Sequence, residues 1–240
     1  MPAVTDLEEL RVAVTGGTSG LGLGLVRLLA ARSARVAFVA RTARAVERVA
    51  HETGAHGIVG DLGRKDDIYP IALQITGNLG GLDVLVNNAS SLGPNPLSLL
   101  GDTECEDLDQ ALAVNLLGPF RLTKALFGAL AASARDGRGA LVINISSDAA
   151  IKAYSGWGAY GASKAALRHL TAIWDEEARA ERVHFLSIDP GDMDTPLHAV
   201  AVPDADRSTL KRPEHSAAEI VETILAALSS QAPRVVGRHP

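Results

Sequence analysis

The sequence has 240 residues, of which 47% are hydrophobic and 21% charged, and it carries a formal net charge of −5. This balance is typical of a globular protein with a substantial core and excludes a disordered chain. Because no concentrated basic face is present, we expect no nucleic-acid partner.

The first residues, MPAVTDLEEL, lack the apolar stretch of a signal peptide, and no segment approaches the roughly 20 apolar residues that span a bilayer. We therefore expect a cytoplasmic protein without membrane contact. The single cysteine, Cys105, cannot form an internal disulfide, which fits a reducing compartment. The seven histidines show no metal-ligand spacing, so we expect no metal site.

Short apolar runs alternate with longer helical patterns along the whole chain. Strands alternating with helices indicate βαβ units and a mainly parallel sheet. The sequence therefore predicts an α/β fold: one domain over 1–240, with a doubly wound, Rossmann-type parallel sheet and helices on both faces. The predicted strands are 11–15, 35–40, 56–60, 83–87, 140–146 and 183–188, with a weaker one at 234–236.

A glycine-rich turn follows the first predicted strand and precedes a helical pattern. Its sequence is Thr15-Gly16-Gly17-Thr18-Ser19-Gly20-Leu21-Gly22. Glycine lets the backbone turn tightly and approach a ligand, and the N-terminus of the following helix favours a negatively charged group. We expect the pyrophosphate of a dinucleotide cofactor here, against Gly16, Thr18, Ser19, Gly20 and Leu21.

The second predicted strand ends in Val39-Ala40-Arg41, with Arg44 nearby and no acidic residue. In this architecture that strand end lies beside the adenosine ribose, where a carboxylate favours NAD. Arginine instead pairs with a phosphate through its planar fork of donors. The sequence therefore favours NADP over NAD, although a solvent-facing arginine is the simpler alternative.

Asn115 is followed four residues later by Pro119. Proline has no N–H, so within a continuous helix it leaves the carbonyl of Asn115 without its partner. A carbonyl freed in this way beside an active site holds a water and relays protons. The alternative is a helix that merely bends at Gly118-Pro119.

Three side chains further along suggest acid–base chemistry. Ser147 follows the strand at 140–146, where ligands bind in open α/β sheets, and its hydroxyl can hydrogen-bond a substrate oxygen. Tyr160 and Lys164 begin a long helical pattern that runs to about Arg179, and residues four apart share a helix face. A lysine cation beside a phenol lowers the tyrosine pKa from its usual value near 10. Taken one at a time, these residues have simpler interpretations: Ser147 as a helix or turn cap, and Tyr160 with Lys164 as a pair on the protein surface.

The segment after the last of these strands has no clear period. Residues 199–213 contain two prolines and several charges, which is typical of either a surface excursion or a flap over a ligand. We expect a substrate-binding loop over 192–215.

Together these pieces resemble the short-chain dehydrogenase/reductase family over nearly the full length of the chain. They occur in the family's order: Thr15-Gly16-x-x-x-Gly20-x-Gly22, Asp61-Leu62, Asn87-Asn88-Ala89, Asn115, Ser147, Tyr160-x-x-x-Lys164 and Pro190-Gly191-x-Met193-x-Thr195. One departure is Ser90, which replaces the usual glycine of the third motif and narrows the space beside the nicotinamide.

The resemblance implies a role for each matching residue. Asp61 and Leu62 would contact the adenine, and Asn88 and Ala89 the middle of the cofactor. Lys164 would also bind the nicotinamide ribose. The remaining implied sets are the residues that close over the nicotinamide, Pro190, Gly191, Met193 and Thr195, and the catalytic tetrad, Asn115, Ser147, Tyr160 and Lys164.

We therefore expect an oxidoreductase that transfers a hydride between NADP(H) and a small-molecule carbonyl or alcohol, with Tyr160 as general acid and base. Substrate-lining residues are expected at Leu92, Tyr154, Trp157 and Leu197, and the assembly is expected to be a homodimer or homotetramer. The main alternative is a non-catalytic regulatory protein that binds a nicotinamide nucleotide. A methyltransferase would leave Tyr160 and Lys164 unexplained, and the intact glycine turn argues against dehalogenation without nicotinamide.

Overall fold

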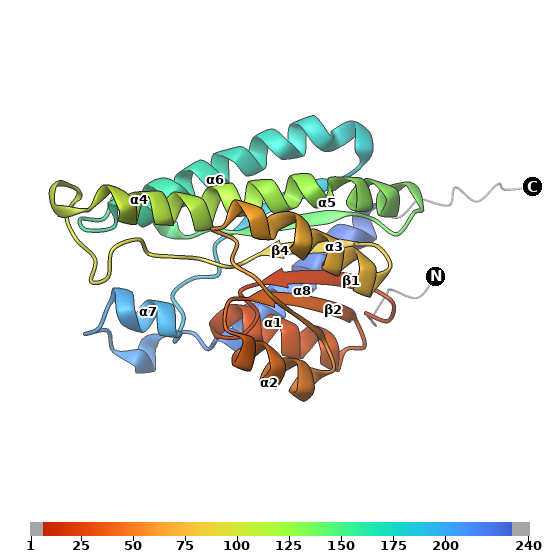
Figure 1. Cartoon of the computed structure of the whole chain (residues 1–240), viewed down its shortest axis with the longest axis horizontal. Coiled ribbons are helices and arrows are strands. Elements are labelled where there is room, and N and C mark those ends of the chain that lie inside the picture. The colour runs from red at the N-terminus through yellow and green to blue at the C-terminus, as the bar shows by residue number, and fades with distance from the viewer. Residues whose placement is uncertain (1–6, 232–240) are drawn as a thin grey trace, which may run out of the picture.

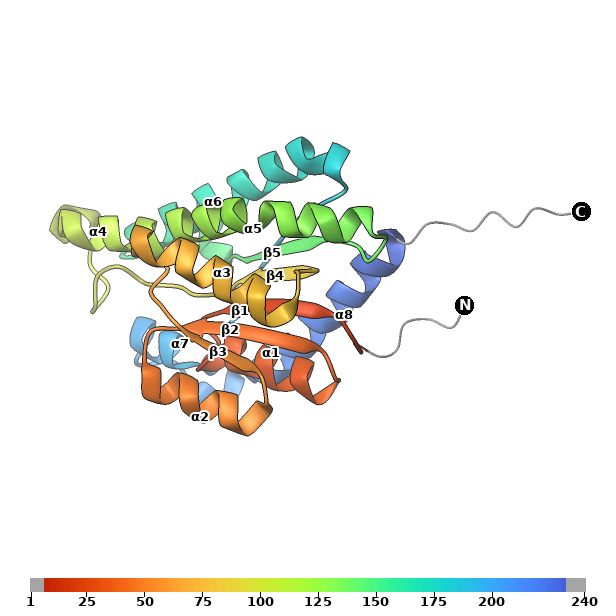
Figure 2. The same ribbon diagram turned by 45° about the vertical axis from the view of Figure 1, so that its right-hand side comes forward.

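The computed structural model describes residues 7–231, which form one sheet between two layers of helices. All strand pairs are parallel and the strand order is β3-β2-β1-β4-β5-β6 (Figures 1 and 2). The predicted doubly wound parallel sheet is confirmed; the weak strand at 234–236 lies outside the described residues. The strands are β1 (Arg11–Thr15), β2 (Arg35–Ala40), β3 (His56–Val59), β4 (Val84–Asn87), β5 (Leu141–Ile145) and β6 (His184–Ile188).

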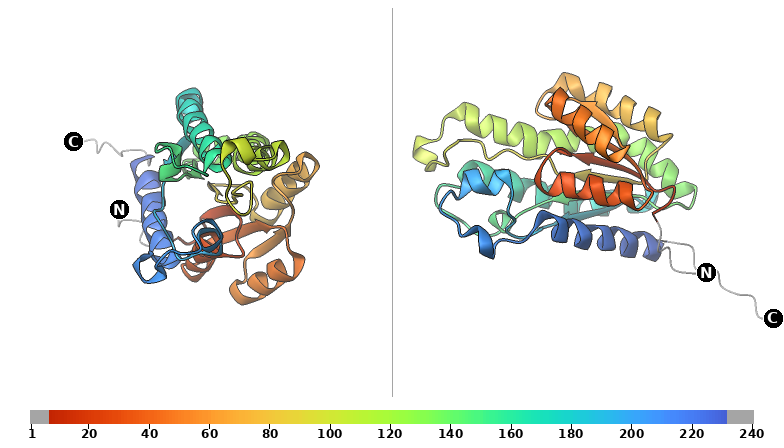
Figure 3. Two further views of the ribbon diagram at one scale, coloured as in Figure 1. Left: turned by 90° about the vertical axis from the view of Figure 1, so that its left-hand side faces the viewer. Right: turned by 90° about the horizontal axis from the view of Figure 1, so that it is seen from below.

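The helices cover both faces of the sheet (Figures 1 and 3). One layer holds α1 (Gly20–Ala31), α2 (Ala43–Thr53) and α8 (Pro213–Gln231), and α1 packs beside α8. The other holds α3 (Ile68–Leu79), α5 (Gly118–Arg135) and α6 (Gly158–Glu177). Two shorter helices, α4 (Cys105–Leu112) and α7 (Pro196–Ala201), lie toward the carboxyl ends of the strands. Within residues 7–231, every helix is too short or too polar to cross a membrane.

The strands are apolar on both sides because both sides are covered. Along β1, Val12 and Val14 pack in the cluster formed with α1, α2 and α8, whereas Ala13 packs in the cluster formed with α3 and α5. This alternation follows from the two-residue period of a strand. The continuous apolar runs in the sequence are therefore strands of a doubly covered sheet.

An ionic cluster closes the amino edge of the sheet. The fully buried carboxylate of Asp83, just before β4, accepts hydrogen bonds from Arg11 Nη2 at 2.6 Å, Arg138 Nη2 at 3.0 Å and Ser133 Oγ at 2.5 Å. Burial opposes ionisation of this carboxyl, but the hydrogen bonds outweigh it and hold the pKa of Asp83 below its usual range. The cluster joins β1, the start of β4 and the end of α5.

The opposite, carboxyl edge of the sheet contains the point where the chain order reverses. From β1 the sheet continues to β2 on one side and to β4 on the other. The two strand ends are joined by Thr15 Oγ1, which accepts from the backbone N–H groups of Asn88 at 2.9 Å and Ala89 at 3.0 Å. A crevice at such a reversal is the general ligand site of open α/β sheets.

Candidate active site

A cleft of about 1140 Å³ opens at this reversal and extends along the carboxyl ends of the strands to α7. Every residue that the sequence suggested for cofactor binding lines it, from Gly16 in the glycine turn to Thr195 before α7. Of the four suggested catalytic residues, Ser147, Tyr160 and Lys164 line the cleft. Asn115 lies behind its wall and is fully buried.

The glycine turn forms a cradle that side chains would fill. Gly16 has φ of +71°, in the left-handed region. A Cβ on Gly22 would lie 2.2 Å from the carbonyl oxygen of Gly16, so α1 packs directly on the turn. At the N-terminus of α1, Ser19 makes no capping hydrogen bond to the described residues and the first turn carries no acid. The N–H groups of that turn fit a pyrophosphate.

The adenosine end of the cleft is bordered by Arg41 and Asp61. Arg41 is exposed at the end of β2, with its side chain on the cleft. Asp61 Oδ1 accepts from the N–H of Gly63 at 2.9 Å, which fixes the turn after β3, and Leu62 packs into the core. This end of the cleft is therefore lined by the guanidinium of Arg41 and by the apolar side chain of Leu62.

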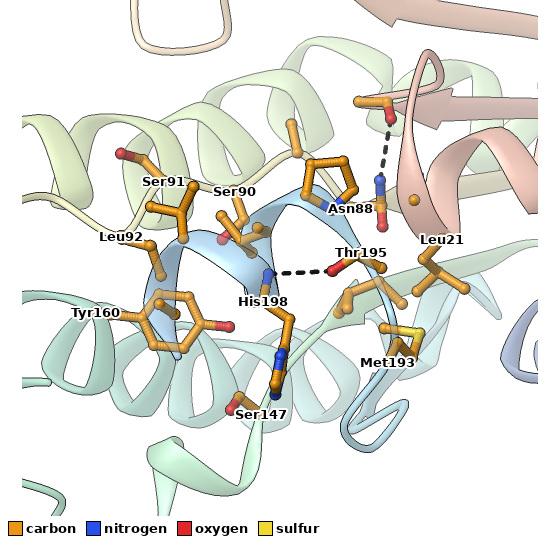
Figure 4. A pocket seen from close by; sticks show the side chains of 18 of the residues that line it. Leu21, Asn88, Ser90, Ser91, Leu92, Ser147, Tyr160, Met193, Thr195 and His198 are labelled. Carbon is orange, nitrogen blue, oxygen red and sulfur yellow. Dashed lines mark hydrogen bonds between the residues drawn. The ribbon is translucent and has the colours of Figure 1, made fainter. Parts of the chain in front are cut away.

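Tyr160 and Lys164 lie on the cleft side of α6, as their spacing predicted. The Nζ of Lys164 lies 5.6 Å from the centroid of the Tyr160 ring and donates to the carbonyl of Ile145 at 2.8 Å. Both side chains are buried, Lys164 being 2% exposed and Tyr160 7%. In Figure 4 the phenol oxygen points into the cleft.

The pKa of Tyr160 differs from the sequence expectation. Burial raises it to about 12, and the hydroxyls of Ser147 and Ser90 offset only part of that effect. Burial also lowers the pKa of Lys164 to about 8. The expectation that the lysine dominates and lowers the tyrosine pKa is therefore wrong, because desolvation is the largest contribution to the pKa of Tyr160. A phenol with this pKa is protonated at neutral pH and can donate a proton.

Ser147 is a cap and also lines the cleft, so the two alternatives that the sequence left open are compatible. It caps a short 3₁₀ turn at Asp148–Ala150, its Oγ accepting from the N–H of Ala149 at 3.2 Å. The same hydroxyl lies in the cleft close enough to Tyr160 to affect its pKa. The cap fixes the position of the hydroxyl at the end of β5.

The continuous helix assumed around Asn115 is not present. Residues Ala113–Leu117 form a π-helical turn in which the N–H of Gly118 donates to the carbonyl of Ala113, five residues back. Pro119 therefore lies in the first turn of α5, where a missing N–H costs little. The inference of a carbonyl freed by Pro119 is corrected: the contacts that the structure shows come from the Asn115 side chain.

That side chain joins the loop after β4 to α6. Asn115 Oδ1 accepts from the N–H of Ser91 at 2.8 Å and from Ser90 Oγ at 3.2 Å. Its Nδ2 donates to the carbonyl of Ser91 at 2.7 Å and to Ser163 Oγ at 2.9 Å. Ser163 in turn donates to the carbonyl of Tyr160 at 2.6 Å. Asn115 therefore holds the first turn of the helix that carries Tyr160.

Sequence reasoning missed three of these positions. Ser91 and Ser163 carry no pattern of their own, and their function follows from contact with Asn115. His198 also lines the cleft, on α7, and was missed because a lone histidine in an irregular segment has no distinguishing signal. Ser90, noted as a departure from the family glycine, contacts Asn115 and lies close enough to Tyr160 to lower its pKa.

The segment over 192–215 lies across the cleft. It contains α7, a 3₁₀ turn at Arg207–Thr209 and a bridge that pairs Met193 with Lys211. Leu197 lines the cleft from this segment, and the other predicted substrate residues, Leu92, Tyr154 and Trp157, line the same cleft. The segment, called the flap below, therefore lines the cleft, and its role in substrate binding stays a prediction.

Comparisons with known proteins identify the family of the chain. A family model described as short chain dehydrogenase matches residues 11–206. Carbonyl reductase family member 4 of Xenopus tropicalis is 31% identical over 186 residues, which are 77% of this chain and 76% of that protein.

Two solved structures are similar over nearly their whole length. A 3-ketoacyl-(acyl-carrier-protein) reductase of Brucella melitensis, complexed with NADH, has a TM-score of 0.83 at 24% identity, covering 90% of this chain and 91% of that chain. A metagenomic short-chain oxidoreductase in complex with NADP has a TM-score of 0.78 at 28% identity, covering 93% of each chain. On the family match and the curated relative, the chain belongs to the short-chain dehydrogenase/reductase family, a family of oxidoreductases.

Proposed function

We propose that this oxidoreductase transfers a hydride between NADP(H) and a carbonyl or alcohol substrate, with Tyr160 as general acid and base. The observation that carries the proposal is that Tyr160, Lys164 and Ser147 share one cleft with the glycine turn. The relative from Xenopus tropicalis is named a carbonyl reductase, which supports this substrate class.

The residues present fit a nicotinamide dinucleotide. The glycine cradle and the open start of α1 would hold the pyrophosphate, and Arg41 would pair with a ribose phosphate. Pro190, Gly191, Met193 and Thr195 would border the nicotinamide. The two solved relatives contain NADH and NADP, respectively, so the choice of NADP rests on Arg41 of this chain.

When bound in its reduced form, the cofactor would supply the hydride. Ser147 would hold the carbonyl oxygen, and Tyr160, protonated at neutral pH, would donate its proton to that oxygen. Lys164, which has a pKa of about 8, would then return a proton toward Tyr160. Asn115 would keep the first turn of α6 in place during the reaction. In the reverse direction Tyr160 would accept the proton.

The test of the reaction is turnover by Tyr160→Phe. Initial rates are measured with NADPH and NADH against ketones, aldehydes, sugars and steroids, and cofactor binding is followed by tryptophan fluorescence. We expect Tyr160→Phe to lose turnover and to keep its cofactor affinity. The matched control is Tyr69→Phe, because Tyr69 is 75% exposed on α3 and should show no change. Retention of most activity by Tyr160→Phe would refute the assigned role.

The test of cofactor choice is Arg41→Ala. A charge-assisted contact at an exposed site contributes about 1–2 kcal/mol, so the KM for NADPH should rise roughly tenfold while that for NADH changes little. Arg48→Ala, an exposed arginine on α2 that does not line the cleft, is the control. If the ratio of the two KM values did not change, Arg41 would be a solvent-facing arginine that does not bind the cofactor.

A further inference from the structure

The substrate end of the cleft contains one polar nitrogen that the protein itself does not use. Among residues 7–231, Nδ1 of His198 is a buried side-chain atom without a hydrogen-bonding partner. His198 lies on α7, and in Figure 4 its imidazole points toward Ser147. An unpaired buried polar atom is unfavourable unless something binds it.

The backbone of His198 is satisfied and fixed in place. Its N–H donates to Thr195 Oγ1 at 3.2 Å, and its carbonyl accepts from the N–H of Val202 at 2.8 Å. Thr195 therefore fixes the backbone of His198. Because Nδ1 is closed to solvent as the side chain stands, a substrate oxygen would reach it by rotation of the imidazole, without movement of the backbone.

The surroundings of the ring on the flap are apolar. Leu197, Val200 and Val202 line the cleft from the same segment and are each more than a third exposed. Of the carboxylates that line the cleft, Asp148 is engaged by the Tyr154 hydroxyl and by Lys152 Nζ. The imidazole is thus a polar group among apolar side chains of this segment, and it points toward Ser147, whose hydroxyl would hold the reacting oxygen.

We propose that His198 is a specificity-determining residue whose Nδ1 binds a second oxygen of the substrate. The substrate class is then a ketone or secondary alcohol with a further carbonyl or hydroxyl oxygen one or two carbons from the reacting carbon, on an otherwise apolar body. This inference rests on the proposed function, because it places the reacting oxygen at Ser147 and Tyr160.

The energetic reason is that a substrate without the second oxygen leaves the buried nitrogen unpaired. Sites built to hydrogen-bond a substrate group discriminate strongly against analogues that lack it. For one neutral hydrogen bond at a partly open site, we expect about tenfold discrimination.

The experiment compares matched substrate pairs in wild type, His198→Phe and His198→Asn. The pairs are ethyl acetoacetate with 2-heptanone, and 2-hydroxycyclohexanone with cyclohexanone. For each pair we take kcat/KM of the compound with the second oxygen divided by kcat/KM of the compound without it. Comparing this ratio between wild type and variant cancels the intrinsic reactivity of the carbonyl. We expect His198→Phe to lower the ratio about tenfold for at least one pair, and His198→Asn, whose amide replaces Nδ1, to recover part of it.

The control is His215→Phe, the same change at an exposed histidine on α8 that does not line the cleft. Titration calorimetry of the same four compounds into the protein with NADP⁺ gives a second readout that does not need turnover. The proposal would be overturned if His198→Phe left both the kcat/KM ratio and the binding preference within twofold of the wild-type values. Failure of the proposed function is a separate result: Tyr160→Phe would then stay active, or wild type would bind no nicotinamide cofactor.

Discussion

Replacing Lys164 with methionine should make the folded protein more stable at neutral pH while it removes activity. Burial lowers the pKa of Lys164 from 10.5 to about 8, which means that the folded state disfavours the ammonium. At pH 7 that lowering corresponds to about 3 kcal/mol, and the lost hydrogen bond to the Ile145 carbonyl offsets about 1 kcal/mol of it. The free energy of unfolding of Lys164→Met should therefore exceed that of wild type by about 2 kcal/mol.

The sign of the pH dependence gives a sharper test. Between pH 8 and 10.5 the unfolded chain still binds the lysine proton, whereas the folded protein has released it. Wild-type stability therefore rises with pH relative to the variant, and the difference disappears near pH 10.5. Urea denaturation at pH 7 and pH 10 measures both free energies.

Lys124→Met is the matched control, because Lys124 is exposed on α5 and should give no pH-dependent difference. A Lys164→Met protein that is less stable than wild type at pH 7, or a gap that does not narrow by pH 10, would refute the reasoning. Turnover measured alongside should fall, since the variant lacks the amine that returns the proton.

Three further variants test the framework around the cleft. Asn115→Ala should lower the free energy of unfolding by about 3–4 kcal/mol, because four hydrogen bonds of its side chain are lost, and it should also lower kcat. Urea denaturation and initial rates check this, and a loss below about 1 kcal/mol would contradict it. Asp83→Asn should lower the free energy of unfolding by roughly 2–3 kcal/mol at pH 7. The difference from wild type should shrink below about pH 4, because a carboxyl with a lowered pKa stabilises the fold only above that range. Denaturation curves at pH 7 and pH 3 measure this, and a difference that stays constant would exclude the ionic explanation. Gly22→Ala should weaken NADPH binding at least tenfold, because the added Cβ displaces the Gly16 carbonyl. Fluorescence titration tests this, with Gly128→Ala, in open space on α5, as the control. Equal affinities of the variant and wild type would show that the turn is not the pyrophosphate site.

Much of the sheet could be predicted from the sequence because its strands are apolar on both faces. The predicted strands at 11–15 and 35–40 agree with β1 and β2 to the residue, and the others differ by one residue at either end. The long helix begins at Gly158, two residues before the predicted start at Tyr160. Local patterns suffice here because each depends on the period of a single element.

The parts that could not be predicted depend on contacts between distant segments. The π-helical turn at Ala113–Leu117 leaves no composition signal, and the Asn115 side chain within it bonds to Ser91 and Ser163. The pKa of Tyr160 follows from how deeply α6 is covered, which a Tyr-x-x-x-Lys spacing does not encode. The unpaired nitrogen of His198 likewise exists only once α7 is in place.

The ionic cluster around Asp83 and the cleft lie at opposite edges of the same sheet, and this separation bears on how the protein can change. The anchoring charges and the two large cores do not include Leu197 or His198 of α7, which line the cleft, whereas Ala201 packs against the small cluster of Leu92, Ala149 and Tyr160. Substitutions of Leu197 and His198 should therefore change the free energy of unfolding little. New substrate preferences can be selected there by successive single replacements, so a saturation library confined to 197–202 should keep most of its members folded.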